Sequence, residues 1–183
     1  MSAPERVHRV APVDGAAADM LPANEFKAAF RNHPGGVAVI TADAGNGPVG
    51  LTASSVISVS ANPPLLCFSL SAFSSAAEAL AKADTVVVHL IDTGQLGTAK
   101  RFATGGIDRF ADPGSWTRLT TGEPVLTSAP TWLRGRIVNR MEAGDSIVVA
   151  AQVLQVQVPE RIPDPLVYHN RTWHRLGNHS AIG

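Results

Sequence analysis

The sequence predicts a mostly β protein with a few helices, built as an antiparallel barrel with the helices at its edge. Short segments rich in β-branched residues recur along the chain, and tight turns join several of them. Two or three helical segments are placed between these strands, and most strands have no helix after them. This order favours an antiparallel barrel over a parallel sheet of βαβ units.

A single folded domain accounts for the length of the chain. It has 183 residues, and domains commonly run to about 100–200 residues. Residues 1–21 mix proline, alanine, glycine and charged residues without apolar periodicity, so they are predicted to form a flexible arm. The domain itself is predicted over residues 22–183.

The first elements after the arm are a helix and two strands joined by a hairpin. Residues 23–31 are predicted as a helix because two phenylalanines share one face at a spacing of four residues. Residues 37–41 (VAVIT) form a short β-branched strand, and residues 48–60 form a long strand or a bent pair of strands. Asn46-Gly47 between them is a favoured dipeptide for a tight hairpin turn.

The rest of the chain alternates between further strands and two helices. Residues 74–83 are rich in alanine and begin with serine, which indicates a helix, and residues 95–103 are predicted as another. Residues 106–128 hold turn formers and scattered aromatic residues, and they are predicted to be a long irregular excursion that is functional or covers a partner. Strands are predicted at residues 65–70, 85–91, 131–142, 146–158 and 166–168.

Composition narrows the class of function. Fifteen basic and fifteen acidic residues give a net charge of zero, whereas nucleic-acid-binding proteins usually carry a basic excess. The apolar runs are too short for a signal peptide or a membrane span. The single cysteine, Cys67, cannot form an intrachain disulfide and fits a reducing compartment. We therefore expect a cytoplasmic protein that binds neither nucleic acid nor membrane.

Two patterns suggest chemistry that the residues around them do not support. Residues 45–50 (GNGPVG) match the dinucleotide fingerprint G-x-G-x-x-G, but the segment after them has the composition of a strand. The fingerprint requires a helix there, so a hairpin turn is the better interpretation. His169, His174 and His179 recur every five residues, which places them on no common face of a helix or strand. We expect no metal site.

Hydroxyl side chains gather in two stretches that are candidates for a ligand site. In residues 52–60, serine and threonine are interleaved with apolar residues, and the second stretch, residues 69–75, lies where a strand passes into a helix. Short hydroxyl side chains bring hydrogen-bond donors to a phosphate or a ring carbonyl without bulk. From these residues alone, a ligand site and the polar face of an edge strand both remain open. Lys100 and Arg101 either complement a helix dipole or reach a phosphate.

The order of several motifs resembles the flavin reductase-like family, an FMN-binding split β-barrel. The resemblance runs from about Phe26 to Leu176. Over this range the chain is similar to the short reductase partners of two-component flavin monooxygenases. It implies an antiparallel, Greek-key-like split barrel and a homodimer with FMN or FAD near the interface. It also implies hydride transfer from NADH or NADPH and release of reduced flavin to a partner oxygenase. The motifs, in order, are HPGGVAVIT, GLTASSVISVSANPPLLCFSL, VVVHLI, KRFA, GEPVL, GDSIVVAAQV and PLVYHNRTWHRL.

The resemblance also implies roles for individual residues. Ser146 stands where many members of the family have a histidine near the flavin and nicotinamide, and Ser146 and His169 are the candidate catalytic side chains. A serine lacks the titratable imidazole, which bears on nicotinamide handling more than on flavin binding. The implied contacts are Thr52, Ala53, Ser54, Ser55, Ser69, Ser71 and Ser74 to the phosphate and ribityl chain, Ser58, Val59 and Ser60 to the ring, Lys100, Arg101 and Phe102 to the phosphate end, and Tyr168, His169 and Arg171 to the nicotinamide.

Other functions remain open beside the reductase. A flavin carrier or sensor would bind flavin without turnover. A split-barrel oxidoreductase similar to the pyridoxamine-phosphate oxidases or the deazaflavin-dependent enzymes would act on another substrate, and a structural dimeric barrel would have no ligand. The sequence does not distinguish FMN from FAD, or NADH from NADPH.

Overall fold

The computed structural model describes residues 8–9, 21–161 and 163–182 of the chain. Within the predicted N-terminal arm, only His8–Arg9 (β1) and residue 21 belong to this described part. β1 pairs in parallel with Met141 and Glu142 of a long strand, β10 (Trp132–Ala143). The rest of the predicted arm lies outside the described residues.

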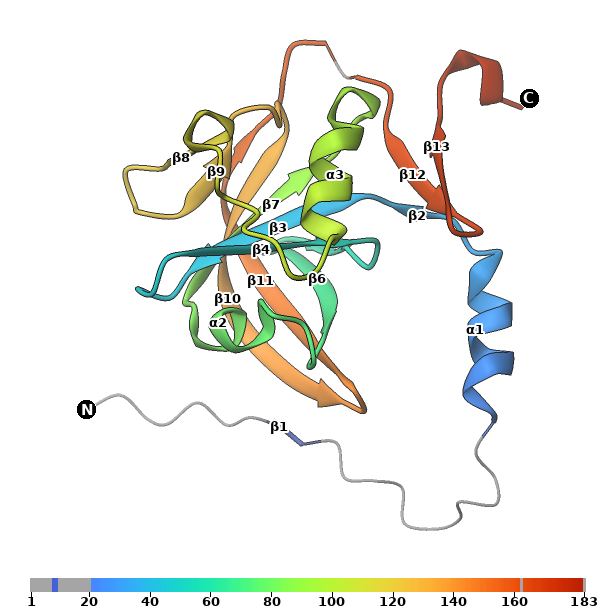
Figure 1. Ribbon diagram of the computed structural model, residues 1–183, viewed down its shortest axis with the longest axis horizontal. Helices are drawn as coiled ribbons and strands as arrows, with labels where there is room; N and C mark the ends of the chain where they lie inside the picture. The colour runs from blue at the N-terminus through green and yellow to red at the C-terminus, as the bar shows by residue number, and fades with distance from the viewer. Residues whose placement is uncertain (1–7, 10–20, 162, 183) are drawn as a thin grey trace.

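One large antiparallel sheet forms the body of the fold and curls into an open barrel (Figure 1). Its strands follow the order β4-β3-β7-β10-β11-β6-β5, so strands that are distant in sequence lie side by side. The prediction of a mostly β, antiparallel fold with a few helices is confirmed. The strands are β3 (Ala38–Asp43), β4 (Pro48–Ala53), β5 (Ile57–Ala61), β6 (Pro64–Ser71), β7 (Thr85–Leu90), β10 and β11 (Ser146–Gln157).

Three helices and two small sheets complete the described part of the chain. The helices are α1 (Ala23–Arg31), α2 (Ala77–Lys82) and α3 (Leu96–Ala103). A three-stranded sheet joins β2 (Gly35–Gly36), β12 (Leu166–His169) and β13 (Thr172–Arg175), and a hairpin joins β8 (Trp116–Arg118) to β9 (Pro124–Leu126). Short 3₁₀ turns lie at Thr93–Gln95, Pro113–Ser115 and Asn178–Ser180.

The structure corrects several of the predicted elements. The excursion of residues 106–128 contains the β8–β9 hairpin, so it is less irregular than predicted. The helix predicted from residue 74 begins at Ala77, because the Ser74 hydroxyl accepts a hydrogen bond from the Ala76 N–H (3.3 Å) in a turn before it. The segment of residues 48–60 is the bent pair of strands, β4 and β5. β13 was not predicted, because its polar sequence, TWHR, lacks a β-branched apolar run.

The G-x-G-x-x-G segment forms the hairpin turn between β3 and β4, as predicted. Asp43 Oδ1 accepts hydrogen bonds from the N–H groups of Gly45 (2.8 Å) and Gly47 (3.1 Å), and both glycines have positive φ angles. Arg118 Nη2 lies 2.6 Å from Asp43 Oδ2. Burial by itself would raise the pKa of Asp43, but the hydrogen bonds from Arg118 and the two glycines, with the Arg118 charge, lower it below its usual value.

Two layers of apolar side chains pack on the two faces of β3. Ile40 faces the barrel interior and belongs to one cluster with Phe68. Val39 faces the other way, into a second cluster with Phe102 of α3. Because β3 is buried on both sides, α3 is held firmly over the β3–β4 pair (Figure 1). A Cβ on Gly50 of β4 would lie only 2.7 Å from the Phe102 ring, so this close approach requires glycine.

A fully buried imidazole, His89 of β7, connects the sheet to β9. Its Nδ1 lies 3.0 Å from the carbonyl oxygen of Val39, and its Nε2 accepts a hydrogen bond from the N–H of Leu126 at 3.0 Å. A carbonyl only accepts, so the proton resides on Nδ1 and the ring is neutral. Burial outweighs the hydrogen bond to Val39 and lowers the pKa of His89 from 6.5 to about 4.

We predict that neutral His89 makes the protein less stable in acid. In the unfolded chain His89 takes up its proton near pH 6.5, whereas the folded protein resists protonation down to about pH 4. The contribution of neutral His89 to the free energy of unfolding is therefore complete above pH 6.5. It falls by about 3 kcal/mol as the pH is lowered toward 4. Urea unfolding at pH 7 and pH 4 should show a smaller loss for His89→Gln than for the wild type. An equal loss in both proteins would contradict this account.

Candidate functional site

The chain leaves the β ladder at residues 54–56, between β4 and β5. There the Ser55 hydroxyl bridges to β6: it donates to the Ser69 carbonyl oxygen (2.9 Å) and accepts from the Ser69 N–H (3.0 Å). The side chain of Ser55 thus satisfies both backbone groups of one β6 residue. Ser54 is left exposed at the break, where its backbone and hydroxyl are available to a ligand.

Three hollows meet at Ser54, which lines all of them. The outer groove, about 640 Å³, lies between α1 and the break and reaches Ile57 and Tyr168. The hydroxyl pocket, about 380 Å³, extends from the break toward the end of α3 and reaches Ser74. The tyrosine pocket, about 200 Å³, lies between them and is closed by Tyr168 and Trp173. Together they form one elongated site along the first hydroxyl-rich stretch.

The hydroxyl pocket brings both hydroxyl-rich stretches of the sequence together. Ser71 accepts a hydrogen bond from the Phe73 N–H (3.3 Å) and Ser74 accepts one from the Ala76 N–H (3.3 Å). Because both oxygens act as acceptors there, their O–H protons remain available to donate to a ligand. The predicted residues that line this pocket are Thr52, Ala53, Ser54, Ser55, Ser69, Ser71, Ser74 and Phe102.

Thr52 has a structural task in addition to lining the pocket. Its hydroxyl donates to the carbonyl oxygen of Ala99 at 2.7 Å, which ties β4 to α3. This bond uses the Thr52 proton, so its oxygen faces a ligand only as an acceptor. The same contact holds Phe102, on the next turn of α3, at the pocket wall.

The cation in the hydroxyl pocket is one that the sequence did not single out. Arg109 lines the pocket, and its Nη1 donates to the Ser75 hydroxyl at 3.1 Å. Lys100 and Arg101, which were predicted at the phosphate end, line none of the three hollows. The Arg101 guanidinium instead lies over the Phe102 ring, 5.4 Å from its centroid. The isolated Arg109, within the excursion, carried no pattern that could have identified it.

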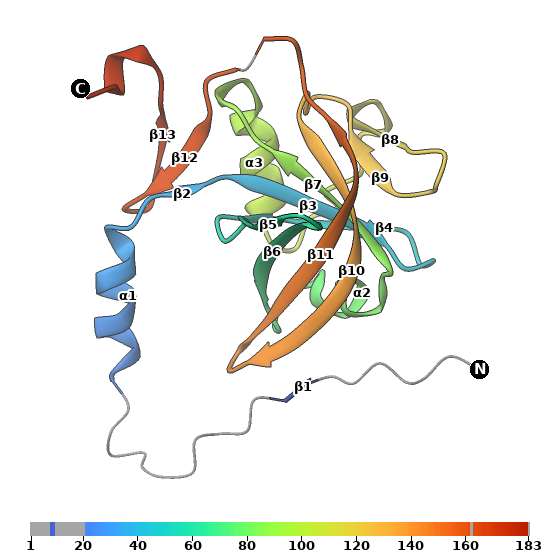
Figure 2. The ribbon, with the colours of Figure 1, turned by 180° about the vertical axis from the view of Figure 1, so that it is seen from behind.

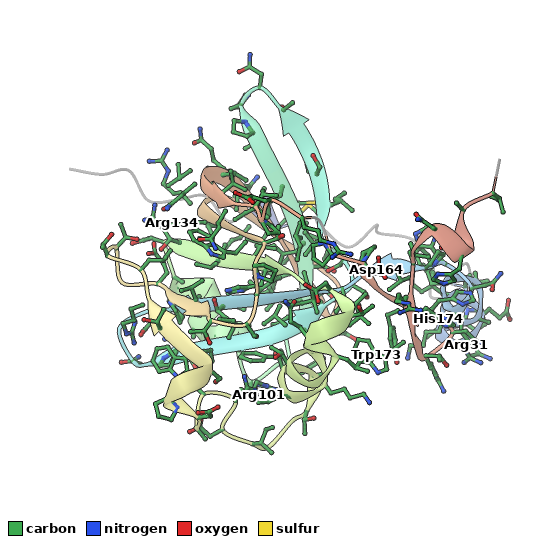
Figure 3. The ribbon with its side chains drawn as sticks, turned by 90° about the horizontal axis from the view of Figure 1, so that it is seen from above. Arg31, Arg101, Arg134, Asp164, Trp173 and His174 are labelled. Carbon is green, nitrogen blue, oxygen red and sulfur yellow. The ribbon has the colours of Figure 1, made fainter. Side chains whose placement is uncertain are left out.

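The outer groove is basic and aromatic, and none of the described residues that line it is acidic. At its end the N–H of Asn170 donates to the carbonyl oxygen of Arg31 (3.0 Å), so the β12–β13 turn holds the end of α1. Figure 3 shows Arg31 and His174 at the same end of the molecule, with Arg101 away from them. The charged and aromatic lining residues are Lys27, Arg31, His33, Arg171, Phe26, Phe30 and Tyr168.

The residues predicted on the nicotinamide side are divided by the structure. Tyr168 lines the outer groove and the tyrosine pocket, and Arg171 lines the groove from a turn position with φ of 61°. His169 lines none of the three hollows; its Nε2 lies 3.0 Å from Asn32 Oδ1, and its ring centroid is 5.5 Å from that of His174. His169 therefore helps to hold the end of α1.

The remaining predicted residues stand beside the hollows. Ser58, Val59 and Ser60 lie on β5 and line none of the three, although Ile57 of the same strand lines the outer groove. Ser146 also lines none of them, but it pairs with Ser71 across β11 and β6. Their contacts with a ligand stay predictions.

Two further properties concern the part of the chain that the structure describes. Within it, no three histidine, cysteine, aspartate or glutamate side chains converge as a metal site would require. None of its helices has the length and apolar character needed to cross a membrane.

Residues 30–177 match the model of the family described as flavin reductase-like domain. An NADH:FMN oxidoreductase of Rhodococcus erythropolis is 42% identical over 156 residues, which cover 84% of this chain and 81% of the relative. An NADH:riboflavin 5'-phosphate oxidoreductase of Streptomyces pristinaespiralis is 34% identical over 150 residues, covering 81% and 85%.

Solved structures share the same architecture. A flavin reductase domain protein from Arthrobacter sp. FB24 superposes with a TM-score of 0.80 at 34% identity, covering 84% of this chain and 95% of the other. BorF, the flavin reductase component of a bacterial two-component tryptophan halogenase, superposes with a TM-score of 0.76 at 26% identity, covering 85% and 98%.

We predict that Gly35→Ala weakens FMN binding, because Gly35 supports the break at Ser54. A Cβ at Gly35 would lie 2.8 Å from the Ser54 carbonyl oxygen, whereas no atom of the described residues lies within 4 Å of a Cβ at Gly36. Displacing Ser54 should weaken FMN binding about tenfold, which is the loss of about one hydrogen bond to the ligand. Titration of FMN fluorescence should show this for Gly35→Ala, with Gly36→Ala close to wild type. Equal affinities in both variants would contradict this supporting role of Gly35.

Proposed function

The chain belongs to the flavin reductase-like domain family, and we propose that it is an NADH:FMN reductase that supplies reduced flavin to a partner monooxygenase. The observation that carries this proposal is the break in the sheet at Ser54, where three hollows join into one elongated site. The names of the Rhodococcus and Streptomyces relatives support NADH and FMN. The role of BorF in a two-component halogenase supports a partner enzyme that receives the reduced flavin.

The residues of the site fit a flavin. A planar ring needs small side chains beside it, and Gly35, Ala53 and Ser54 provide them at the junction of the hollows. A flavin phosphate needs hydrogen-bond donors, and Ser71 and Ser74 offer free O–H protons in the hydroxyl pocket. The ring would therefore lie toward the outer groove and the phosphate toward the hydroxyl pocket.

The protein contributes binding and orientation to this reaction. A bound flavin supplies the redox chemistry, because its N5 accepts a hydride from the nicotinamide C4. Ser55 and Ser69 hold the backbone at the break, and Tyr168 faces the space that a nicotinamide would enter. Stacking the two rings at the right distance and excluding water needs no nucleophile or acid–base pair from the protein.

The outer groove suits the nicotinamide cosubstrate. Three arginine and lysine side chains, Lys27, Arg31 and Arg171, line it without an acidic neighbour among the lining residues. A pyrophosphate is attracted to such a cluster. The exposed rings of Phe26 and Phe30, with centroids 4.8 Å apart, offer an apolar surface beside these charges. NADH and FMN would thus meet at Ser54 from opposite sides.

We also infer that the reductase is a homodimer. No residue of α1 is buried, and α1 stands apart from the sheet (Figure 2). On β11, Val149 and Ala151 face the core, so Val148 and Ala150 face outward, where a single-layer sheet usually carries polar residues. Such an apolar outer face indicates an interface. Two exposed apolar side chains extend it: Ile57, whose β6 partner Cys67 pairs in turn with Ala150, and Leu154 of β11.

This face adjoins the outer groove, which Ile57 and Ser69 line. A second copy seated there would close the groove and shield the flavin from water. The single cysteine, Cys67, is a free thiol, which supports a location in the reducing cytoplasm.

We predict that the protein sediments with twice the chain mass of 19.1 kDa. Leu154→Asp, which places a charge on the exposed apolar face of β11, should shift the protein toward the monomer because an unpaired charge is costly to bury. Analytical ultracentrifugation of both proteins measures this. A wild-type protein that sediments as a monomer at every concentration would contradict the dimer.

We predict that NADH oxidation by this protein depends on added FMN. Ser54→Asp should weaken FMN binding and turnover at limiting FMN at least tenfold, because Ser54 also lines the hydroxyl pocket and a carboxylate there would repel the phosphate at the far end of the same pocket. Asn46→Asp adds the same charge in the exposed β3–β4 turn and should leave turnover unchanged. Absorbance at 340 nm follows NADH oxidation, and quenching of flavin fluorescence follows binding.

The possible outcomes separate the competing functions. Binding of FMN without NADH oxidation would favour a flavin carrier or sensor. Absence of binding to both FMN and FAD would exclude every flavin-based function for this chain.

A further inference from the structure

We propose that Arg109 recognises the flavin phosphate and makes the site selective for phosphorylated flavins over riboflavin. This inference rests on the proposed function, because it specifies which flavins the same site accepts. It assigns a specificity-determining role to a residue outside the hydroxyl-rich segments.

Charge is the first reason. Arg109 is the one charged side chain among the residues that line the hydroxyl pocket. Hydroxyl groups such as those of Ser71 and Ser74 can donate hydrogen bonds to a phosphate, but they cannot balance its charge. An anion that leaves water for a pocket needs a counter-charge as well as donors. Arg109 is placed to provide it.

The hydrogen bonding of the guanidinium is the second reason. Its Nη1 donates to the Ser75 hydroxyl at 3.1 Å, while its Nε is buried and has no partner in the described part of the chain. A buried donor without a partner is costly, and a phosphate oxygen would satisfy it. The planar fork of arginine matches two phosphate oxygens at once.

Arg101 provides a natural comparison. Its Nε is also buried without a hydrogen bond. However, its guanidinium lies over the Phe102 ring and does not line the hydroxyl pocket. Arg101 belongs to α3 itself, next to Phe102, whereas Arg109 lines the hydroxyl pocket opposite that ring.

The excursion between α3 and β8 positions Arg109. The next residue, Phe110, packs edge-on against Phe102 (5.2 Å between centroids) and against Trp116 (5.3 Å). Trp116 Nε1 donates to the Phe110 carbonyl oxygen at 3.1 Å, and the Phe110 N–H donates to Asp108 Oδ1 at 2.9 Å. Because Phe102 is itself a wall of the pocket, this aromatic ladder fixes the distance between Arg109 and the serines.

The test compares FMN and riboflavin, which differ only in the phosphate. We expect Arg109→Gln to weaken FMN binding about 10- to 100-fold, as for the loss of charge-assisted hydrogen bonds, and to leave riboflavin binding within about twofold. Arg101→Gln is the matched control and should bind both flavins like the wild type. Fluorescence titration gives the affinities, and thermal melting followed by circular dichroism verifies that each variant is folded.

Two further measurements keep the test decisive if Arg109→Gln fails to fold. Inorganic phosphate should compete with FMN but not with riboflavin for the wild-type protein. Trp116→Phe, which removes the Nε1–H donor, should lower the affinity for FMN and spare riboflavin.

Several results would overturn the assignment. Equal losses for FMN and riboflavin in Arg109→Gln would show that Arg109 does not recognise the phosphate. A loss of FMN preference in Arg101→Gln as large as that in Arg109→Gln would overturn the assignment of phosphate selectivity to Arg109. A wild-type protein that binds FMN and riboflavin equally would contradict the role of Arg109 and leave the proposed function standing. A wild-type protein that binds neither flavin would contradict the proposed function itself.

Discussion

The break in the sheet between β4 and β5 is the constraint on which the site depends. A strand that continued through residues 54–56 would pair with its neighbour and leave no room for a ligand. Instead the Ser55 hydroxyl satisfies both backbone groups of Ser69, so the chain departs from the ladder without leaving these groups unpaired. Gly35, which has no Cβ, allows β2 to approach the exposed Ser54 closely. The three hollows open where these contacts leave space.

The hydrophobic core holds the strands beside this break in place. β3 is buried on both faces, with Ile40 in the barrel interior and Val39 against α3. α3 is pinned to β4 by the Thr52 hydroxyl and by the contact of Phe102 with Gly50. These parts of the pocket wall therefore rest on packed side chains, as a site that orients two rings requires.

Residue types and local patterns predicted much of this structure. Local sequence predicts the Asn46-Gly47 turn, the antiparallel order of the strands and the two hydroxyl-rich stretches. The two stretches meet in one pocket. Contacts between distant residues could not be predicted in this way. Arg109 reaches the pocket only because the Phe110 ring packs on Phe102, and His169 is engaged by Asn32, 137 residues away. Local sequence also could not predict that the Arg101 guanidinium lies over the Phe102 ring.

The most direct measurement is a crystal structure of the protein with bound FMN. The account predicts that the isoalloxazine ring lies against the backbone of Ser54 and Ser55, with the phosphate among Ser71, Ser74 and Arg109. FMN bound elsewhere on the molecule, or bound with its phosphate outside the hydroxyl pocket, would contradict it.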